Sequence, residues 1–468
     1  MGAARPSTLG ALRDSGWDSV PVKEEVRRNT ARRVAEGRPV VEGVRGYEDT
    51  VLPQLENALL AGHDVIFLGE RGQAKTRMIR SLTGLLDEWL PVVAGSEIQD
   101  DPYAPVSRHA RDLVAAEGDA TPISWVHRDA RFGEKLATPD TAIADLIGEV
   151  DPIKVAEGRY LSDELTIHYG LVPRTNRGIF AINELPDLAE RIQVGLLNVL
   201  EERDVQIRGY KVRLPLDLLL VASANPEDYT NRGRIITPLK DRFGSQIRTH
   251  YPLDLATEVA VINQEAVPFS AGGLCVNVPD FMVEVVATIS QLARTSPHVN
   301  QRSGVSVRLS VANHEVLSAA AARRALRAGE REAVPRVSDL GALVASTTGK
   351  IEVEALEDRA GAEVVDRLLS AAVLTVFKER VPSAAVAEIV LSFDGGTVLH
   401  AGDDLPSADY VAALDGLPAL GQVVADLTGG AESPALVASA VELVLEGLHL
   451  SKRLNKDSAG PRATYTTR

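Results

Sequence analysis

The amino-acid sequence predicts an α/β protein with a parallel sheet core, followed by a helical lid and a further mainly helical C-terminal region. The first observation is a set of short apolar runs bounded by turn residues and separated by helical segments. This alternation is typical of strands buried on both faces of a parallel sheet with crossover helices. The second observation is that apolar residues after about residue 251 recur at helical spacing only. The predicted strands are 65–68, 123–126, 179–182 and 218–222.

Residue spacing predicts four parts along the 468-residue chain. Residues 1–40 form a polar leader that ends in a helix, and residues 41–250 form the α/β domain. Residues 251–350 form a small helical lid. Residues 351–468 form a mainly helical extension with a disordered tail. The predicted helices of the α/β domain and lid are 47–61, 76–90, 255–267, 281–293 and 309–328.

Composition places the chain among globular proteins, with 45% hydrophobic and 25% charged residues. No apolar run approaches the roughly 18 residues of a membrane-spanning helix, and the N-terminus does not resemble a signal peptide. The single cysteine, Cys275, cannot form an internal disulfide, and we expect it to be a small buried residue. We therefore expect a cytoplasmic protein with no membrane partner.

The formal net charge of −15 disfavours binding to nucleic acid, because sequence-independent binding depends on neutralising phosphates. The segment 23–33, KEEVRRNTARR, is the best candidate for a local basic patch. Its charge spacing favours a solvated helix face whose side chains form ion pairs with each other along the helix. A role in docking a partner or nucleic acid stays open for this segment.

A phosphate-binding loop is predicted between the strand at 65–68 and the helix that follows it. Backbone N–H groups and a helix N-terminus cradle phosphates at such a position. Lys75 is expected to reach the β- and γ-phosphates of ATP, and the Thr76 hydroxyl to ligate Mg²⁺. The usual glycine before the lysine is Ala74, which fits if that position is helical. The alternative is an ordinary strand–turn–helix connection. The loop reads Gly69, Glu70, Arg71, Gly72, Gln73, Ala74, Lys75 and Thr76.

The run 178–184, GIFAINE, is typical of the second phosphate-site strand, Walker B. Open α/β sheets bind ligands at the carboxyl ends of their strands, where this run delivers two polar side chains. Glu184 is expected to polarise the attacking water as a general base. Asn183 occupies the position usually held by an aspartate that binds Mg²⁺ through water. We expect slow but real hydrolysis with a raised Mg²⁺ requirement, which Asn183→Asp should lower.

Further polar residues complete the predicted site. Asn225 follows the strand at 218–222 and suits the sensor 1 role, in which an amide positions the attacking water. Arg242 is the preferred arginine finger, a side chain that acts on the nucleotide of a neighbouring subunit. Its rivals are Arg232 and Arg234. Arg308, at the start of a lid helix, suits the sensor 2 role. Each arginine has the alternative of a structural ion pair.

Five segments together resemble the magnesium-chelatase ATPase subunit and its relatives, the MoxR group of AAA+ proteins. The likeness covers residues from about 40 to 330, and its most telling part, 146–183, contains the helix-2 insert in that family. The resemblance implies a ring of identical subunits, usually a hexamer, with ATP between them. It also implies a partner with a von Willebrand factor A domain. The segments are GERGQAKT, LIGEVDPIKVAEGRY, GLVPRTNRGIFAINELPDL, ASANPEDY and PLKDRFG.

The sequence leaves three functions open for the chain. The first is a MgATP-hydrolysing motor that remodels a partner protein or drives metal insertion. The second is a nucleotide-binding scaffold with little turnover, which the missing charge at Asn183 favours. The third is a nucleic-acid remodelling ATPase, disfavoured by the acidic charge and by the absence of a zinc knuckle or a GAFTGA loop.

Overall fold

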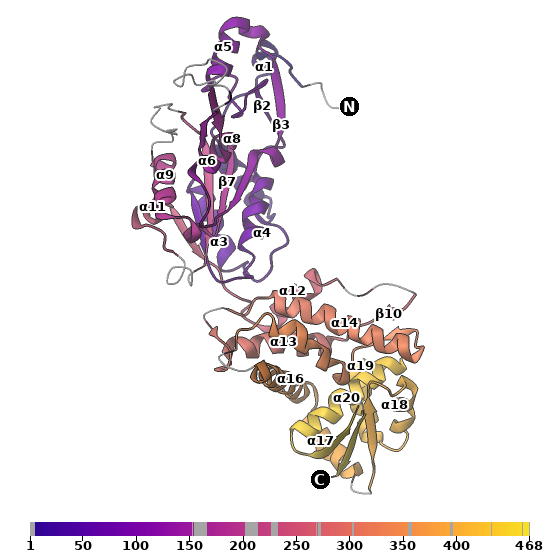
Figure 1. The fold of residues 1–468 in the computed structure, drawn as a ribbon. Coiled ribbons are helices and arrows are strands. Elements are labelled where there is room, and N and C mark those ends of the chain that lie inside the picture. Colours follow the sequence, from indigo (N-terminus) through magenta and orange to yellow (C-terminus); the bar gives the residue numbers. More distant parts are fainter. Residues whose placement is uncertain are drawn as a thin grey trace. The chain divides into compact units, whose positions relative to one another are not determined.

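The computed structural model divides into two compact units, residues 1–250 and 251–468, each described by itself (Figure 1). The structure describes residues 5–151, 153, 166–201, 214–225, 233–267, 269, 273–301, 304–353, 358–393, 396–431, 433–460 and 462–467. Within these residues, no helix is both long and apolar enough to cross a membrane.

A five-stranded parallel sheet forms the centre of the first unit, which confirms the predicted α/β fold. Its strand order is β4-β7-β8-β1-β9, so the first strand along the chain lies between the fourth and the fifth. The polar carboxyl end of β8 therefore lies next to the loop that follows β1. The strands are β1 (Val65–Leu68), β4 (Phe132–Leu136), β7 (Gly178–Asn183), β8 (Leu218–Ala224) and β9 (Ser245–Arg248).

The central strands β1, β7 and β8 of this sheet are buried on both faces, which explains their continuous apolar runs. Val65 and Phe67 join one core with residues of α2, α3 and α4, whereas Ile66 and Leu68 join a second core with residues of α9 and α11. The helices of this unit are α1 (Leu9–Asp14), α2 (Val22–Ala35), α3 (Val51–Leu60), α4 (Lys75–Ser81), α5 (Arg108–Glu117), α6 (Ile143–Leu146), α8 (Leu171–Arg174), α9 (Glu190–Glu201) and α11 (Thr237–Arg242).

Two sequence predictions for this unit need correction, and two edge strands of the sheet were not predicted. The predicted strand at 123–126 belongs to β3 (Ile123–His127), which pairs antiparallel with β2 (Trp89–Val93) outside the main sheet. The predicted helix at 76–90 ends at Ser81 and continues only as a 3₁₀ turn, Leu82–Leu85, which contains the poor helix former Gly84. The edge strands β4 and β9 were missed, because half-exposed edges mix polar with apolar residues.

A second antiparallel pair lies within the segment that carries the family likeness. It joins β5 (Gly148–Val150) to β6 (Ile167–Tyr169). The intervening part of the predicted helix-2 insert, 152 and 154–165, lies outside the described residues, as do residues 202–213 after α9.

The basic segment 23–33 lies on α2, and much of its charge is paired within the first unit. Lys23 contacts Asp64 at 2.8 Å, and Arg28 contacts Asp87 at 2.6 Å. Buried Glu25 accepts two hydrogen bonds, of 2.8 and 2.6 Å, from Arg131, which is fully buried. These pairs favour a structural role for the segment.

The second unit is mainly helical, and α13 and α16 pack in the same core as the deeply buried α20. Its helices are α12 (Leu255–Glu265), α13 (Asp280–Thr295), α14 (Arg308–Ala328), α15 (Leu343–Thr348), α16 (Asp358–Arg380), α17 (Ser383–Phe393), α18 (Ser407–Leu414), α19 (Pro418–Thr428) and α20 (Pro434–Leu450).

Strands are also present after residue 251, contrary to the sequence prediction. Short β10 (Cys275–Val276) pairs with β11 (Glu332–Ala333), and Cys275 is exposed rather than buried. The tail that we expected to be disordered forms β14 (Arg462–Thr467), between β12 (Leu399–Gly402) and β13 (Leu454–Ala459). The reason is that Tyr465 is buried, and its hydroxyl donates to Glu446 of α20 at 2.5 Å.

Candidate functional site

The predicted phosphate loop lies where the sequence placed it, between the buried strand β1 and helix α4. Gly72 has φ of +75°, a left-handed conformation that glycine adopts without strain. Gly69 packs so tightly that an added Cβ would lie 1.9 Å from Oγ1 of Thr249. The two glycines therefore meet two separate needs of the turn, a left-handed backbone and a close approach.

Ala74 departs from the sequence expectation, because its backbone is left-handed rather than helical. Its φ is +55° and its ψ is +14°. An L-residue with a Cβ is disfavoured in this conformation by about 1–2 kcal/mol, which explains why glycine is usual before the lysine. Ala74 is thus a strained residue at the N-terminus of α4, and strain of this kind concentrates at functional sites.

Lys75 and Thr76 are the first two residues of α4. The Lys75 side chain is held inside the loop, where its ammonium donates to the carbonyl oxygen of Gly69 and, at 2.7 Å, to that of Glu70. Only 7% of Lys75 is exposed. Thr76 is half-buried in the first helical turn. The loop thus combines a fixed positive charge with a hydroxyl beside it.

Two side chains that sequence reasoning missed support the loop from outside. The Tyr47 hydroxyl lies 2.9 Å from the carbonyl oxygen of Gln73 and 2.7 Å from that of His250, and its single proton is shared between these two acceptors. Burial raises the pKa of Tyr47 well above its usual value, so the hydroxyl keeps its proton and remains a donor. Thr249 donates at 2.6 Å to the Gln73 side-chain oxygen. Both come from segments distant in sequence, which no local motif reveals.

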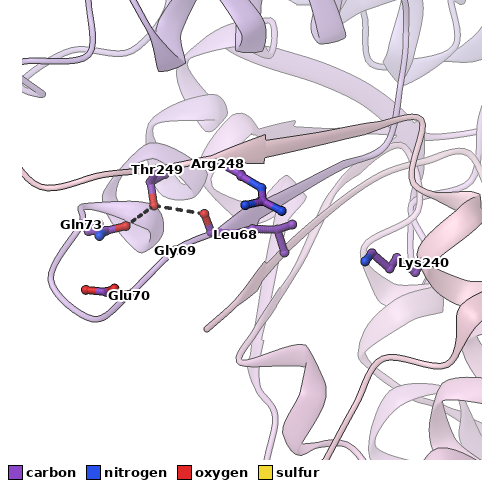
Figure 2. A pocket seen from close by; sticks show the side chains of 7 residues that line it. All are labelled: Leu68, Gly69, Glu70, Gln73, Lys240, Arg248 and Thr249. Atoms are coloured by element: carbon purple, nitrogen blue, oxygen red, sulfur yellow. Dashed lines mark hydrogen bonds between the residues drawn. The ribbon is translucent and has the colours of Figure 1, made fainter. Parts of the chain in front are cut away.

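A cavity of about 340 Å³ opens beside the loop (Figure 2). Its wall includes two cations that the sequence did not single out, Lys240 of α11 and Arg248 at the end of β9. Both side chains are exposed. Positive side chains beside a phosphate loop favour an anionic ligand. The lining residues are Leu68, Gly69, Glu70, Gln73, Lys240, Arg248 and Thr249.

The ends of β7 and β8 bring the other predicted residues to the same edge of the sheet. The Gly69 N–H donates to the carbonyl oxygen of Ala224 at 3.1 Å, which fixes the start of the loop against the end of β8. Asn225 follows directly and is buried. Asn183 ends β7, the neighbour of β8, and Glu184 comes next with a left-handed φ of +54°. The fold therefore brings Asn183, Glu184 and Asn225 to the edge of the sheet at which the loop begins.

Asn183 is held by hydrogen bonds on both sides. Its Nδ2 donates to Oε1 of Glu134 at 2.5 Å, and its Oδ1 accepts from Oγ of Ser223 at 3.1 Å. Ser223 Oγ also accepts the backbone N–H of Glu184 at 3.3 Å. Glu134 and Ser223 were not among the predicted residues, and only the sheet register brings them to this position.

The oxygen donors suit Mg²⁺, which prefers carbonyl, carboxylate, hydroxyl and water ligands. Thr76 offers a hydroxyl and Asn183 an amide oxygen. Among the described residues, no group of three or more His, Cys, Asp or Glu side chains could hold a metal on its own. The donor set therefore fits a Mg²⁺ bound chiefly through phosphate and water, with few protein ligands.

Among the described residues of the first unit, the predicted arginines Arg234 and Arg242 make contacts with residues other than those of this cluster. Arg242 ends α11, is about half exposed, and pairs with Glu201 at the end of α9. Arg234 is exposed, and its backbone oxygen accepts from Gln193 at 3.1 Å. Arg232 lies outside the described residues. Arg308 is an exposed residue at the start of α14 in the second unit. The finger and sensor 2 roles stay predictions.

No protein-family model matches the chain. Magnesium-chelatase subunit ChlI of Nostoc sp. is 29% identical over 254 residues, which cover 51% of this chain and 62% of that protein. The magnesium-chelatase 38 kDa subunit of Rhodobacter capsulatus is 29% identical over 245 residues, covering 49% and 62%. The chain thus spans less than two thirds of the length of these relatives.

The solved structures that align with this chain superpose on it poorly. A chain from the complex between subunits BchI and BchD of magnesium chelatase gives a TM-score of 0.35 with 21% identity, covering 70% of this chain and 100% of that one. NtrX from Brucella abortus gives 0.39 with 16% identity, covering 74% and 66%. The relationship therefore rests on the sequence comparison. That comparison shows that about half of this chain is similar to subunits of magnesium chelatase.

Proposed function

We propose that this chain binds MgATP beside the loop 69–76 and hydrolyses it. The observation that carries the proposal is the meeting of Lys75, Asn183 and Asn225 at one edge of the sheet. The Gly69–Ala224 hydrogen bond fixes the start of the phosphate loop against the end of β8. Open parallel sheets bind ligands at this edge.

Each residue has a distinct task in the proposed reaction. The Lys75 ammonium turns from the loop carbonyls to the β- and γ-phosphates, while the N-terminus of α4 cradles them. Thr76 and Asn183 would hold Mg²⁺, which would supply charge stabilisation at the phosphate oxygens. Glu184 polarises the attacking water, and Asn225 positions it. Glu184 has a left-handed backbone directly after strand β7, so the chain leaves the strand geometry at this residue.

The proposed active form is a ring, usually a hexamer in the family, in which Arg242 of one subunit reaches the nucleotide of the next. An arginine finger stabilises the charge that develops on the transferring phosphoryl group. The half-exposed position of Arg242 at a helix end supports this role. Arg308 is proposed to act from the lid as sensor 2.

The likeness to magnesium-chelatase subunits supports an ATP-driven function of the same class, which we place in the cytoplasm. The motor would remodel a partner protein or drive metal insertion, and a protein with a von Willebrand factor A domain is the proposed partner. A second candidate is a nucleotide-binding scaffold with little turnover. It is favoured by Asn183, which contributes no negative charge to the metal site.

The rate of ATP hydrolysis, measured against Mg²⁺ concentration, separates the two candidates. We expect wild type to exceed Glu184→Gln by about a hundredfold or more, the usual contribution of a general base. Glu24→Gln, an exposed carboxylate on α2, is the matched control and should hydrolyse ATP like wild type. If wild type and Glu184→Gln have equal rates at every Mg²⁺ concentration, with partner protein present, the scaffold replaces the motor.

A further inference from the structure

The amide of Asn183 is clamped between two neighbouring strands. Its nitrogen donates to Glu134 of β4 at 2.5 Å, and its oxygen accepts from Ser223 of β8 at 3.1 Å. Only 7% of Asn183 is exposed, so water has little access to compete for these bonds. The side chain is therefore fixed in one of its two amide orientations.

The chemistry of Glu134 decides which orientation this is. An ionised carboxylate can only accept hydrogen bonds, so the amide must turn its NH₂ group toward β4. Its carbonyl oxygen then faces β8. Because β8 is the neighbour of β1, this is the side of the sheet on which the phosphate loop lies. In the reverse orientation, two donor hydrogens would face the site of a cation.

A residue of α4, the helix after the predicted phosphate loop, also binds Glu134. Oε2 of Glu134 accepts from Nε of Arg80 at 2.8 Å. Arg80 lies four residues after Thr76 on α4, and residues at this spacing share one face of a helix. The hydrogen bonds thus run from α4 through Glu134 and Asn183 to Ser223, which also accepts the N–H of Glu184. One connected set of bonds joins the metal side of the site to the proposed base.

We propose that Glu134 is a positioning residue that allows an asparagine to stand where an aspartate is usual. It fixes the carbonyl oxygen of Asn183 on the Mg²⁺ side and brings a carboxylate against the uncharged amide. The inference rests on the proposed function, since it assumes that the site binds MgATP. It reverses our sequence-based expectation for Asn183→Asp. That substitution places a second carboxylate against Glu134 with no hydrogen between them.

A double-mutant cycle on the full chain tests the pairing of Glu134 and Asn183. The variants are Glu134→Gln, Asn183→Asp and the two combined. The readout is the Mg²⁺ concentration that gives half-maximal binding of a fluorescent ADP analogue, with binding of the same probe in EDTA as a second readout. If Glu134 and Asn183 merely support the fold, their substitution should weaken binding of the ADP analogue both with Mg²⁺ and in EDTA.

We expect each single variant to raise the required Mg²⁺ concentration about tenfold, because Glu134→Gln removes the charge that strengthens this part-buried hydrogen bond and Asn183→Asp removes its donor. The combined variant should return to within about threefold of wild type, because the glutamine can donate to the new carboxylate. Binding in EDTA should change less than twofold in all three. Glu24→Gln, which removes an exposed carboxylate paired with Arg27, should match wild type throughout.

Two results would overturn the proposal, and they differ. If wild type binds no ADP analogue at any Mg²⁺ concentration, the proposed function fails and the proposal fails with it. If wild type binds, but Asn183→Asp alone lowers the Mg²⁺ requirement or the two substitutions simply add, only the role of Glu134 is wrong. Thermal unfolding of each variant checks that all four chains are folded before binding is compared.

Discussion

Ala74→Gly tests whether the phosphate loop is strained at the residue before its lysine. Alanine in the left-handed region is disfavoured by about 1–2 kcal/mol, and glycine removes that cost. Glycine also makes the unfolded chain more flexible, which lowers stability by about 0.4–1 kcal/mol. The two effects leave Ala74→Gly at or above the stability of wild type, although alanine-to-glycine changes in helices destabilise.

Ala115→Gly is the matched control, because Ala115 is an exposed residue within helix α5 with ordinary helical geometry. It carries the same penalty in the unfolded chain but relieves no strain, so it should lower stability by about 0.5–1 kcal/mol. The difference between the two variants reports the strain at Ala74. For a unit of this size, 1 kcal/mol shifts the unfolding temperature by about 2–4 °C.

Scanning calorimetry of the full chain measures this difference on the transition that shifts when MgATP is added. We expect Ala74→Gly to unfold about 2–8 °C above Ala115→Gly, which is the strain of 1–2 kcal/mol converted at that rate. Equal losses of stability in the two variants would refute the strained loop. Tighter MgATP binding by Ala74→Gly would show that the strain also acts on ligand binding.

Three further predictions follow from the structure. Arg242→Ala should bind ATP but not hydrolyse it, and mixing it with Glu184→Gln subunits should restore some activity; no recovery in confirmed mixed rings would exclude Arg242 as the finger. Burial lowers the pKa of His314 below its ordinary value of 6.5, so the unfolded chain binds the proton more readily and stability is lost as pH falls below 6.5. The unfolding temperature of wild type should therefore drop more between pH 7 and pH 5 than that of His314→Gln, and parallel drops would contradict this. Glu25→Gln should cost about 3–5 kcal/mol in urea unfolding, because it leaves buried Arg131 without its counter-charge, and a cost below about 1 kcal/mol would show that the pair matters little.

The central part of the fold could be predicted from sequence because burial on both faces leaves a clear pattern. The strands β1, β7 and β8 are continuous apolar runs, and their ends carry the polar residues of the site. The edge strand β4 reads Phe-Gly-Glu-Lys-Leu, with two charges, and was missed for that reason. This strand carries Glu134. Because its two charged residues prevented prediction of the strand, Glu134 was not predicted as a candidate site residue either.

Long-range contacts account for what else the sequence could not reveal. Tyr47 and Thr249 support the phosphate loop from about 26 and 176 residues away from Gln73, and no local spacing links them. The tail of the chain looks polar and irregular. It forms β14 because a single tyrosine, Tyr465, finds a buried partner on α20. Ala74 shows a different limit of sequence-based prediction, because the identity of a residue does not determine its backbone angles.

Titration of MgATP into the Lys75→Ala variant tests the central claim most directly. The claim is that the loop 69–76 is the nucleotide site, with Lys75 as the fixed positive charge against the phosphates. Calorimetric titration should show binding by wild type and by Lys350→Ala, which removes an exposed lysine of the second unit. Lys75→Ala should show no measurable binding. Undiminished affinity in Lys75→Ala would contradict the assignment of the site.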